Sequence, residues 1–102
     1  MIIKIARDFT ITPGGRFREH GKFSAEEFRD DILMPAMDIH DVVTIDLDGT
    51  YGFAITFLDE VFSYLLNYYS KDLLRKKLKF ISNETPTYIN EIKNIMFPGE
   101  EV

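Results

Sequence analysis

The sequence contains no cysteine and no long run of apolar residues. Without thiols the chain can form neither disulfides nor thiolate zinc sites, so its fold has to be held together by burial alone. No apolar stretch approaches the ~20 residues that a membrane-spanning helix needs. Lys4, Arg7 and Asp8 also place charges close to the start of the chain. We therefore expect a soluble, cytoplasmic protein with no membrane partner.

Positive charge is scarce as well. The chain has 12 Lys and Arg residues against 17 Asp and Glu residues, which gives a formal charge of −5. A dedicated nucleic-acid-binding protein needs a basic face that displaces the counterions of the phosphates, so we expect no nucleic-acid partner. The one basic run, residues 75–79, is interpreted as a solvated surface near a helix end, where cations complement the helix dipole.

Residues 1–9 alternate between apolar and polar side chains, which is the period of a half-buried strand. A Pro-Gly-Gly turn follows and predicts a reversal into a short second strand over residues 16–19. A first helix is predicted from Ser24, because Ser24 and Glu27 have the spacing of a capping box. Pro35 is expected to end or kink this helix, since proline has no N–H to donate.

Residues 42–47 are apolar and rich in β-branched side chains, and they end at an Asp-Gly turn, so we expect the central strand here. Thr56 and Asp59 again have capping-box spacing, which predicts that the second helix begins at Thr56. The apolar residues of this helix recur every three or four positions, as on one buried helix face: Leu58, Val61, Phe62, Leu65, Leu66 and Tyr69. Residues 78–82 read as another strand, and Thr85 is expected to cap a last helix.

These elements follow the order β-β-α-β-α-β-α. Strands that are separated by helical crossovers predict an α/β fold with a small, mostly parallel sheet of about four strands and helices packed on it. A chain of this length can bury about 65% of its unfolded surface, which supports one modest core but not two domains. We expect a single domain over residues 1–97 and an acidic C-terminal tail over residues 98–102.

The strand that ends in Asp46-Leu47-Asp48-Gly49-Thr50, with Ser82 after a later strand, resembles the first two motifs of the haloacid dehalogenase phosphotransferases. This resemblance implies a nucleophile at Asp46, an acid/base at Asp48, a phosphate contact at Ser82 and bound magnesium. That family also needs a downstream lysine and a final acidic pair, which this sequence does not supply in the required pattern. A structural turn at Asp48-Gly49 is the favoured interpretation. His20 and His40 lack a second histidine at ligand spacing, and we predict no cofactor.

Four segments in this order resemble the STAS-like family of unknown function, which is similar in fold to the bacterial anti-sigma-factor antagonists. They are TPGGRFR at residues 12–18, FSAEEFR at 23–29, the strand with its DLDG turn at 43–49, and FLDEVF at 57–62. The resemblance extends over residues 3–97. It implies a small signalling module that is often encoded with, or fused to, a histidine-kinase-like ATPase domain.

In the antagonist relatives, a serine at the start of the helix after the central strand is phosphorylated by a partner kinase. The STAS-like family tends to carry Gly-Ser-Ser-Phe at this point, whereas this chain reads Ala54-Ile55-Thr56-Phe57. Thr56 therefore keeps the second hydroxyl. We favour a role for Thr56 as a helix N-cap, with a phosphoacceptor as the alternative. Asp59 and Glu60 would lie close to a phosphate at this position and repel it.

The sequence thus predicts a non-catalytic signalling or regulatory module that docks a protein partner, a kinase-like ATPase, through the loop after the central strand and the start of the next helix. Two other functions stay open: a minimal phosphotransferase that uses Asp46 and Asp48, and a module that binds a small ligand or nucleotide at the carboxyl ends of the strands. The oligomeric state stays open too, a dimer included. The expected contact residues are Asp48, Gly49, Tyr51, Gly52, Phe53 and Thr56.

Overall fold

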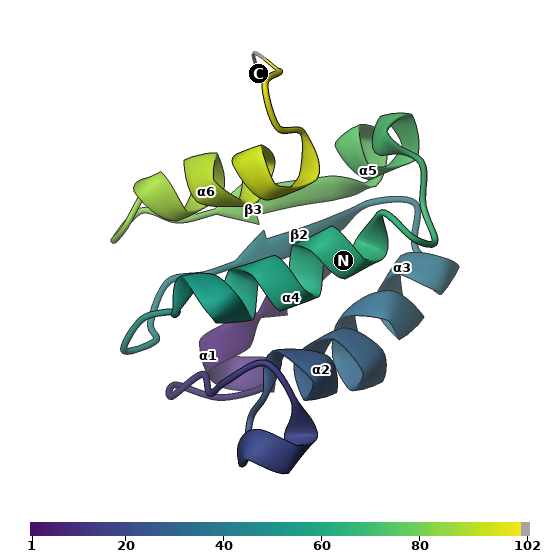
Figure 1. The fold of residues 1–102 in the computed structure, drawn as a ribbon. Coiled ribbons are helices and arrows are strands. Elements are labelled where there is room, and N and C mark those ends of the chain that lie inside the picture. The colour runs from purple at the N-terminus through teal and green to yellow at the C-terminus, as the bar shows by residue number, and fades with distance from the viewer. Residues whose placement is uncertain (101–102) are drawn as a thin grey trace.

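The computed structural model describes residues 1–100 and confirms an α/β fold (Figure 1). Its sheet is wholly parallel and has three strands in the order β1-β2-β3, one fewer than the sequence predicts. None of the helices in the described part of the chain is both long and apolar enough to cross a membrane. The elements are β1 (Ile2–Lys4), α1 (Ile5–Asp8), η1 (Arg18–His20), α2 (Ala25–Phe28), η2 (Arg29–Leu33), α3 (Met34–Ile39), β2 (Val43–Asp46), α4 (Ile55–Leu65), α5 (Lys71–Lys77), β3 (Leu78–Ile81) and α6 (Thr87–Met96).

The prediction of two strands at the N-terminus is largely wrong. The first strand stops at Lys4, where the backbone N–H donates to the Asp8 carboxylate at 2.9 Å and the chain turns into α1. Residues 16–19 form no strand, because their segment caps α2 instead. The carbonyls of Gly15 and Arg16 accept hydrogen bonds from the first N–H groups of α2, which would otherwise lack partners.

The sheet has one covered face and one open face. In its register, Ile3, Ile45 and Phe80 are paired across the three strands and point toward the helices. The neighbouring positions point to the opposite face, where Ile2 is exposed. On the covered side, α4 and α6 lie side by side and α2 flanks α4 (Figure 1). The core therefore lies between the sheet and these helices.

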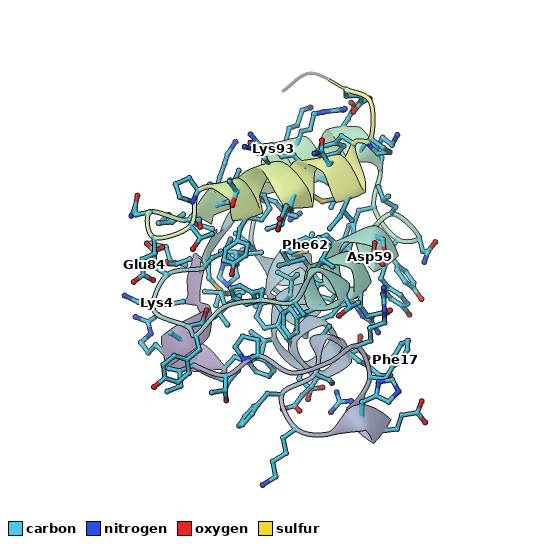
Figure 2. The ribbon with its side chains drawn as sticks, turned by 60° about the vertical axis from the view of Figure 1, so that its left-hand side comes forward. Lys4, Phe17, Asp59, Phe62, Glu84 and Lys93 are labelled. Carbon is cyan, nitrogen blue, oxygen red and sulfur yellow. The ribbon has the colours of Figure 1, made fainter. Side chains whose placement is uncertain are left out.

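The long helix α4 supplies much of the core, as its periodicity predicts. Phe62 points into the interior of the molecule (Figure 2) and packs edge-on against Phe80, with ring centroids 5.7 Å apart. Leu58, Val61 and Leu65 are also fully buried, as predicted, and Phe57 is buried in addition to the predicted residues.

The first helix begins as the sequence predicts, since the Ser24 hydroxyl accepts a hydrogen bond from the Glu27 N–H at 3.1 Å. It does not end at Pro35. The turn before the proline is a π-helix, in which the N–H of Met34 bonds to the carbonyl of Arg29, five residues earlier. This wider turn accommodates a residue without an N–H, and the helical path continues to Ile39.

The C-terminal part holds two further differences. Lys77 is not simply solvated, because its ammonium donates to the carbonyls of Met37 and His40 and so caps the end of α3. Thr85 does not cap the last helix, which begins at Thr87 with Pro86 as its N-cap residue. Of the expected tail, residues 101–102 lie outside the described part of the chain.

Candidate functional site

Apart from Thr56, which lies in α4, the expected contact residues lie in the loop of residues 47–54, which joins β2 to α4 at the carboxyl end of the central strand. A second segment, residues 82–88, follows the neighbouring strand β3 and leads into α6. Because parallel strands end at the same edge of a sheet, the two segments meet there. The hydrogen bonds between them determine which of the expected residues are exposed.

Asp48 and Gly49 hold this junction together. One carboxylate oxygen of Asp48, Oδ1, accepts hydrogen bonds from the N–H groups of Asn83 and Glu84, both at 2.9 Å. The Glu84 carboxylate in turn accepts from the Gly49 N–H, and Figure 2 shows Glu84 at this end of the molecule. Gly49 has a φ of 90°, and a Cβ there would lie 3.1 Å from that of Ala6. The Asp48-Gly49 pair therefore has a structural role, in agreement with the favoured interpretation of the sequence: it joins the loop after β2 to the segment after β3, and we term this contact the clasp.

The other residues of the phosphotransferase hypothesis are also engaged in turns. Asp46 accepts a hydrogen bond from the Asp48 N–H at 3.0 Å through Oδ1. The Ser82 hydroxyl is buried and donates to the Thr85 carbonyl at 2.6 Å. Among residues 1–100, no three His, Asp or Glu side chains are grouped so that they could hold a metal ion. These contacts give each of the three residues a structural role, and no observation specifically favours phosphoryl transfer.

Phe53 belongs to the core, so its predicted place on the contact surface is wrong. Its side chain is 8% exposed and packs against Phe57 and Tyr88, with ring centroids 5.5 and 5.4 Å apart. Its backbone N–H donates to the Tyr88 hydroxyl at 3.1 Å. Gly52, with a φ of 121°, lies so close to that hydroxyl that a Cβ would approach it to 3.2 Å. The glycine thus allows the chain to turn Phe53 inward.

Tyr51 remains on the surface, with 84% of its area exposed. Its backbone N–H donates to the carbonyl of Ile11 at 2.8 Å, which holds the N-terminal loop against this one. Ile11 is 48% exposed and Ile55, the first residue of α4, is 56% exposed. Large apolar side chains thus project to solvent from three adjoining points: the N-terminal loop, the β2–α4 loop and the start of α4.

Thr56 is not the N-cap of α4, contrary to the sequence prediction. The helix begins at Ile55, and Ala54 occupies the N-cap position, where its carbonyl accepts hydrogen bonds from Phe57 and Leu58. Thr56 is the second helical residue and is exposed. Its hydroxyl has no hydrogen-bond partner among the described residues, so capping does not account for it.

The two acids that follow Thr56 on the same helix face are paired with arginines. Asp59 accepts a hydrogen bond from Arg16 at 2.9 Å, and Glu60 accepts one from Arg29 at 2.7 Å. The hydrogen bond to Asp59 raises the pKa of Arg16. The repulsion that Asp59 and Glu60 would exert on a phosphate is therefore largely neutralised.

Arg29 is the residue that sequence reasoning missed. It is only 3% exposed, and its guanidinium lies 3.6 Å from the centroid of the Tyr64 ring. Burial on its own would lower the pKa of Arg29, but hydrogen bonds to Asp30 and Glu60 outweigh this effect, so the pKa is raised. The cluster joins η2 to α4 and fixes the orientation of the helix that carries Thr56.

A polar cleft of about 220 Å³ lies between the two segments that meet at this edge. Its lining includes the acids Asp48 and Glu84 as well as Thr50 and Tyr88. Sites for small molecules usually have volumes of about 300–1,000 Å³. The small volume and the two carboxylates both disfavour a nucleotide, whose phosphates would meet negative charge.

Comparison with protein families matches residues 24–88 to the STAS-like domain of unknown function. The match covers more than half of the chain, so the protein belongs to this family. It includes the β2–α4 loop and all of α4, and it confirms the resemblance seen in the sequence. Comparisons with curated proteins and with solved structures gave no significant match.

Proposed function

We propose that this STAS-like domain is a non-catalytic signalling module of the bacterial cytoplasm, which docks a histidine-kinase-like ATPase through a surface formed by Ile11, Tyr51, Ile55 and Thr56. The observation that carries the proposal is the combination of an exposed Tyr51 with a loop that is held in place on both sides. Asp48, Gly49 and Phe53 bind the loop to the segment of residues 83–88, and Tyr51 binds it to Ile11.

Such a surface suits protein recognition for two physical reasons. A loop that is already ordered loses little conformational entropy when a partner binds. Tyrosine offers a large contact area with only two rotatable bonds and is enriched in the residues that dominate interface energies. Ile11, whose carbonyl accepts the Tyr51 N–H, and Ile55, four residues after Tyr51 in the chain, are further exposed apolar residues of this region.

The substitution Tyr51→Ala tests this surface. We expect about tenfold weaker binding to the purified kinase-like ATPase, because a central interface tyrosine contributes more than 1 kcal/mol. Isothermal titration calorimetry measures the change. The control is Tyr68→Ala, since Tyr68 is also exposed but lies at the other end of α4. Equal affinity of both variants and the wild type would reject this surface.

We further propose that phosphorylation of Thr56 controls this docking. Thr56 is exposed and its hydroxyl is free among the described residues, and the start of a helix favours a phosphate through its free N–H groups and dipole. A phosphate adds about two negative charges, enough to create or disrupt a docking surface. Arg16 lies within hydrogen-bond distance of Asp59, one helical turn from Thr56, and offers a cation for the phosphate.

Co-expression with the kinase-like ATPase tests the modification. Intact mass spectrometry is expected to show one added phosphate, which disappears in Thr56→Val. The matched control is Thr87→Val, because Thr87 is an exposed threonine in the first turn of α6. Loss of the phosphate in the control alone, or an unmodified wild-type protein, would show that Thr56 is not the acceptor.

A further inference from the structure

A second surface lies in the C-terminal half of the chain, along the free edge of β3. It is a groove of about 360 Å³, which we term the β3 groove. Its floor and walls come from α5, β3 and α6 and are apolar: Leu74, Leu78, Phe80, Ile89, Met96 and Phe97. The volume is large enough for one or two apolar side chains of a partner.

The backbone of β3 offers hydrogen-bonding groups to this groove. β3 pairs only with β2, and the carbonyl of Ile81 accepts from the Leu47 N–H on that side. Because successive residues of a strand direct their backbone groups to opposite edges, the N–H and C=O of Phe80 face the groove. Within the described residues these two groups are left without a partner strand. The groove therefore combines apolar walls with the unpaired edge of a sheet.

The rim of the groove is basic although the chain as a whole has a charge of −5. Arg75, Lys79 and Lys93 line it, and Figure 2 shows Lys93 on α6. Neither lysine forms an ion pair with a residue in the described part of the chain. Arg75 stacks on the Phe97 ring at 4.4 Å and binds the carboxylate of Glu100. Arg75 also pairs with Asp72 at 3.1 Å, so the positive charge left uncompensated at the rim, among the described residues, is that of Lys79 and Lys93.

We propose that the β3 groove binds an extended acidic segment of a partner protein, which adds to β3 as a fourth strand. The backbone of the segment bonds to Phe80, an apolar side chain enters between α5 and α6, and acidic side chains meet Lys79 and Lys93. Edge-to-edge pairing with a second copy of this chain is disfavoured, because it would bring two basic rims together. This surface is separate from the one proposed around Tyr51, and neither proposal depends on the other.

A capped heptapeptide of alternating glutamate and valine is a suitable probe. Titrated into the isotope-labelled domain, it is expected to shift the amide resonance of Phe80 and to slow hydrogen exchange at that amide. The double variant Lys79→Glu/Lys93→Glu is expected to weaken binding about tenfold, because two ion pairs are replaced by repulsive contacts. The control Lys4→Glu/Lys22→Glu changes the net charge equally at exposed lysines outside the groove, and its affinity is expected to stay within about twofold.

Two further peptides separate the parts of the proposal. A heptapeptide of lysine and valine tests charge, and the glutamate peptide with its central residue N-methylated tests the backbone hydrogen bonds. Both are expected to bind much more weakly than the original. The proposal is overturned if either binds as tightly, if the two double variants lose affinity equally, or if millimolar glutamate peptide leaves the Phe80 amide unchanged.

Discussion

Replacing Phe53 by alanine is expected to lower the free energy of unfolding by about 3–4 kcal/mol, whereas Tyr51→Ala should change it by less than about 0.5 kcal/mol. The two aromatic residues are separated by one glycine, yet Phe53 is 8% exposed and Tyr51 is 84% exposed. Removal of the Phe53 ring leaves a cavity between Phe57 and Tyr88, which surround it. For a domain of this size the change corresponds to a fall in Tm of roughly 12–30 °C.

Thermal unfolding followed by circular dichroism measures both variants. Phe53→Leu provides the matched control, because it keeps most of the volume and is expected to lose less than about 1.5 kcal/mol. If Phe53→Ala were as stable as Tyr51→Ala, the side chain would not lie in the core. A second consequence concerns binding experiments: Phe53 is unsuitable as a probe of the contact surface, since its substitution would weaken a partner's binding by disturbing the fold.

The burial of Phe53 shows where local sequence patterns stop being informative. Aromatic residues that alternate with glycines, as in Gly49-Thr50-Tyr51-Gly52-Phe53, are typical of an exposed loop, and Tyr51 is exposed as predicted. Phe53 differs from Tyr51 in its burial because of Tyr88, which lies 35 residues further along the chain. The Tyr88 ring packs against Phe53, and the Tyr88 hydroxyl accepts a hydrogen bond from the Phe53 N–H. Nothing in residues 49–55 indicates this contact.

Thr56 illustrates a second limit of prediction from local sequence patterns. Thr56 and Asp59 have the spacing of a capping box, but so does any threonine that happens to lie three residues before an acid inside a first helical turn. The helix begins where the chain leaves the loop that Gly52 and Tyr88 fix, which makes Ala54 the N-cap. In contrast, Ser24 is a true cap.

Elements with strong internal periodicity were predictable. The buried face of α4, the central strand β2 and the strand β3 follow from patterns that are contained within each segment. The short elements at the N-terminus were not, because residues 15–18 make their hydrogen bonds with the start of α2 rather than with another strand. The hydrogen bonds of the clasp between Asp48 and residues 83–84 could be predicted only in part. The sequence indicates a turn at Asp48, but it does not indicate that residues 83–84 donate to the Asp48 carboxylate.

Replacing Arg29 by alanine is expected to lower the free energy of unfolding by about 3 kcal/mol, since loss of one member of a buried ion pair leaves the other charge without compensation. The guanidinium bonds to Glu60 at 2.7 Å and to Asp30 at 2.8 Å and covers the face of Tyr64. Glu60 is largely shielded from solvent, with 15% of its side chain exposed. Arg29→Lys keeps the charge but loses the planar contact with Tyr64 and the separate bonds to two acids, so we expect an intermediate loss.

Arg16 provides the matched control for this prediction, because it pairs with Asp59 and Glu60 on the same helix face while 34% of its side chain is exposed. An ion pair that is accessible to water contributes less than about 1 kcal/mol, so Arg16→Ala should unfold at nearly the wild-type urea concentration. The pairing with Glu60 is measured by a double-mutant cycle of Arg29→Ala and Glu60→Gln, in which the two losses should not add. Additive losses in the cycle, or equal losses for Arg16→Ala and Arg29→Ala, would contradict this prediction. Burial would then not strengthen the ion pairs of Arg29, and the apolar face of α4 alone would determine how the helix is oriented.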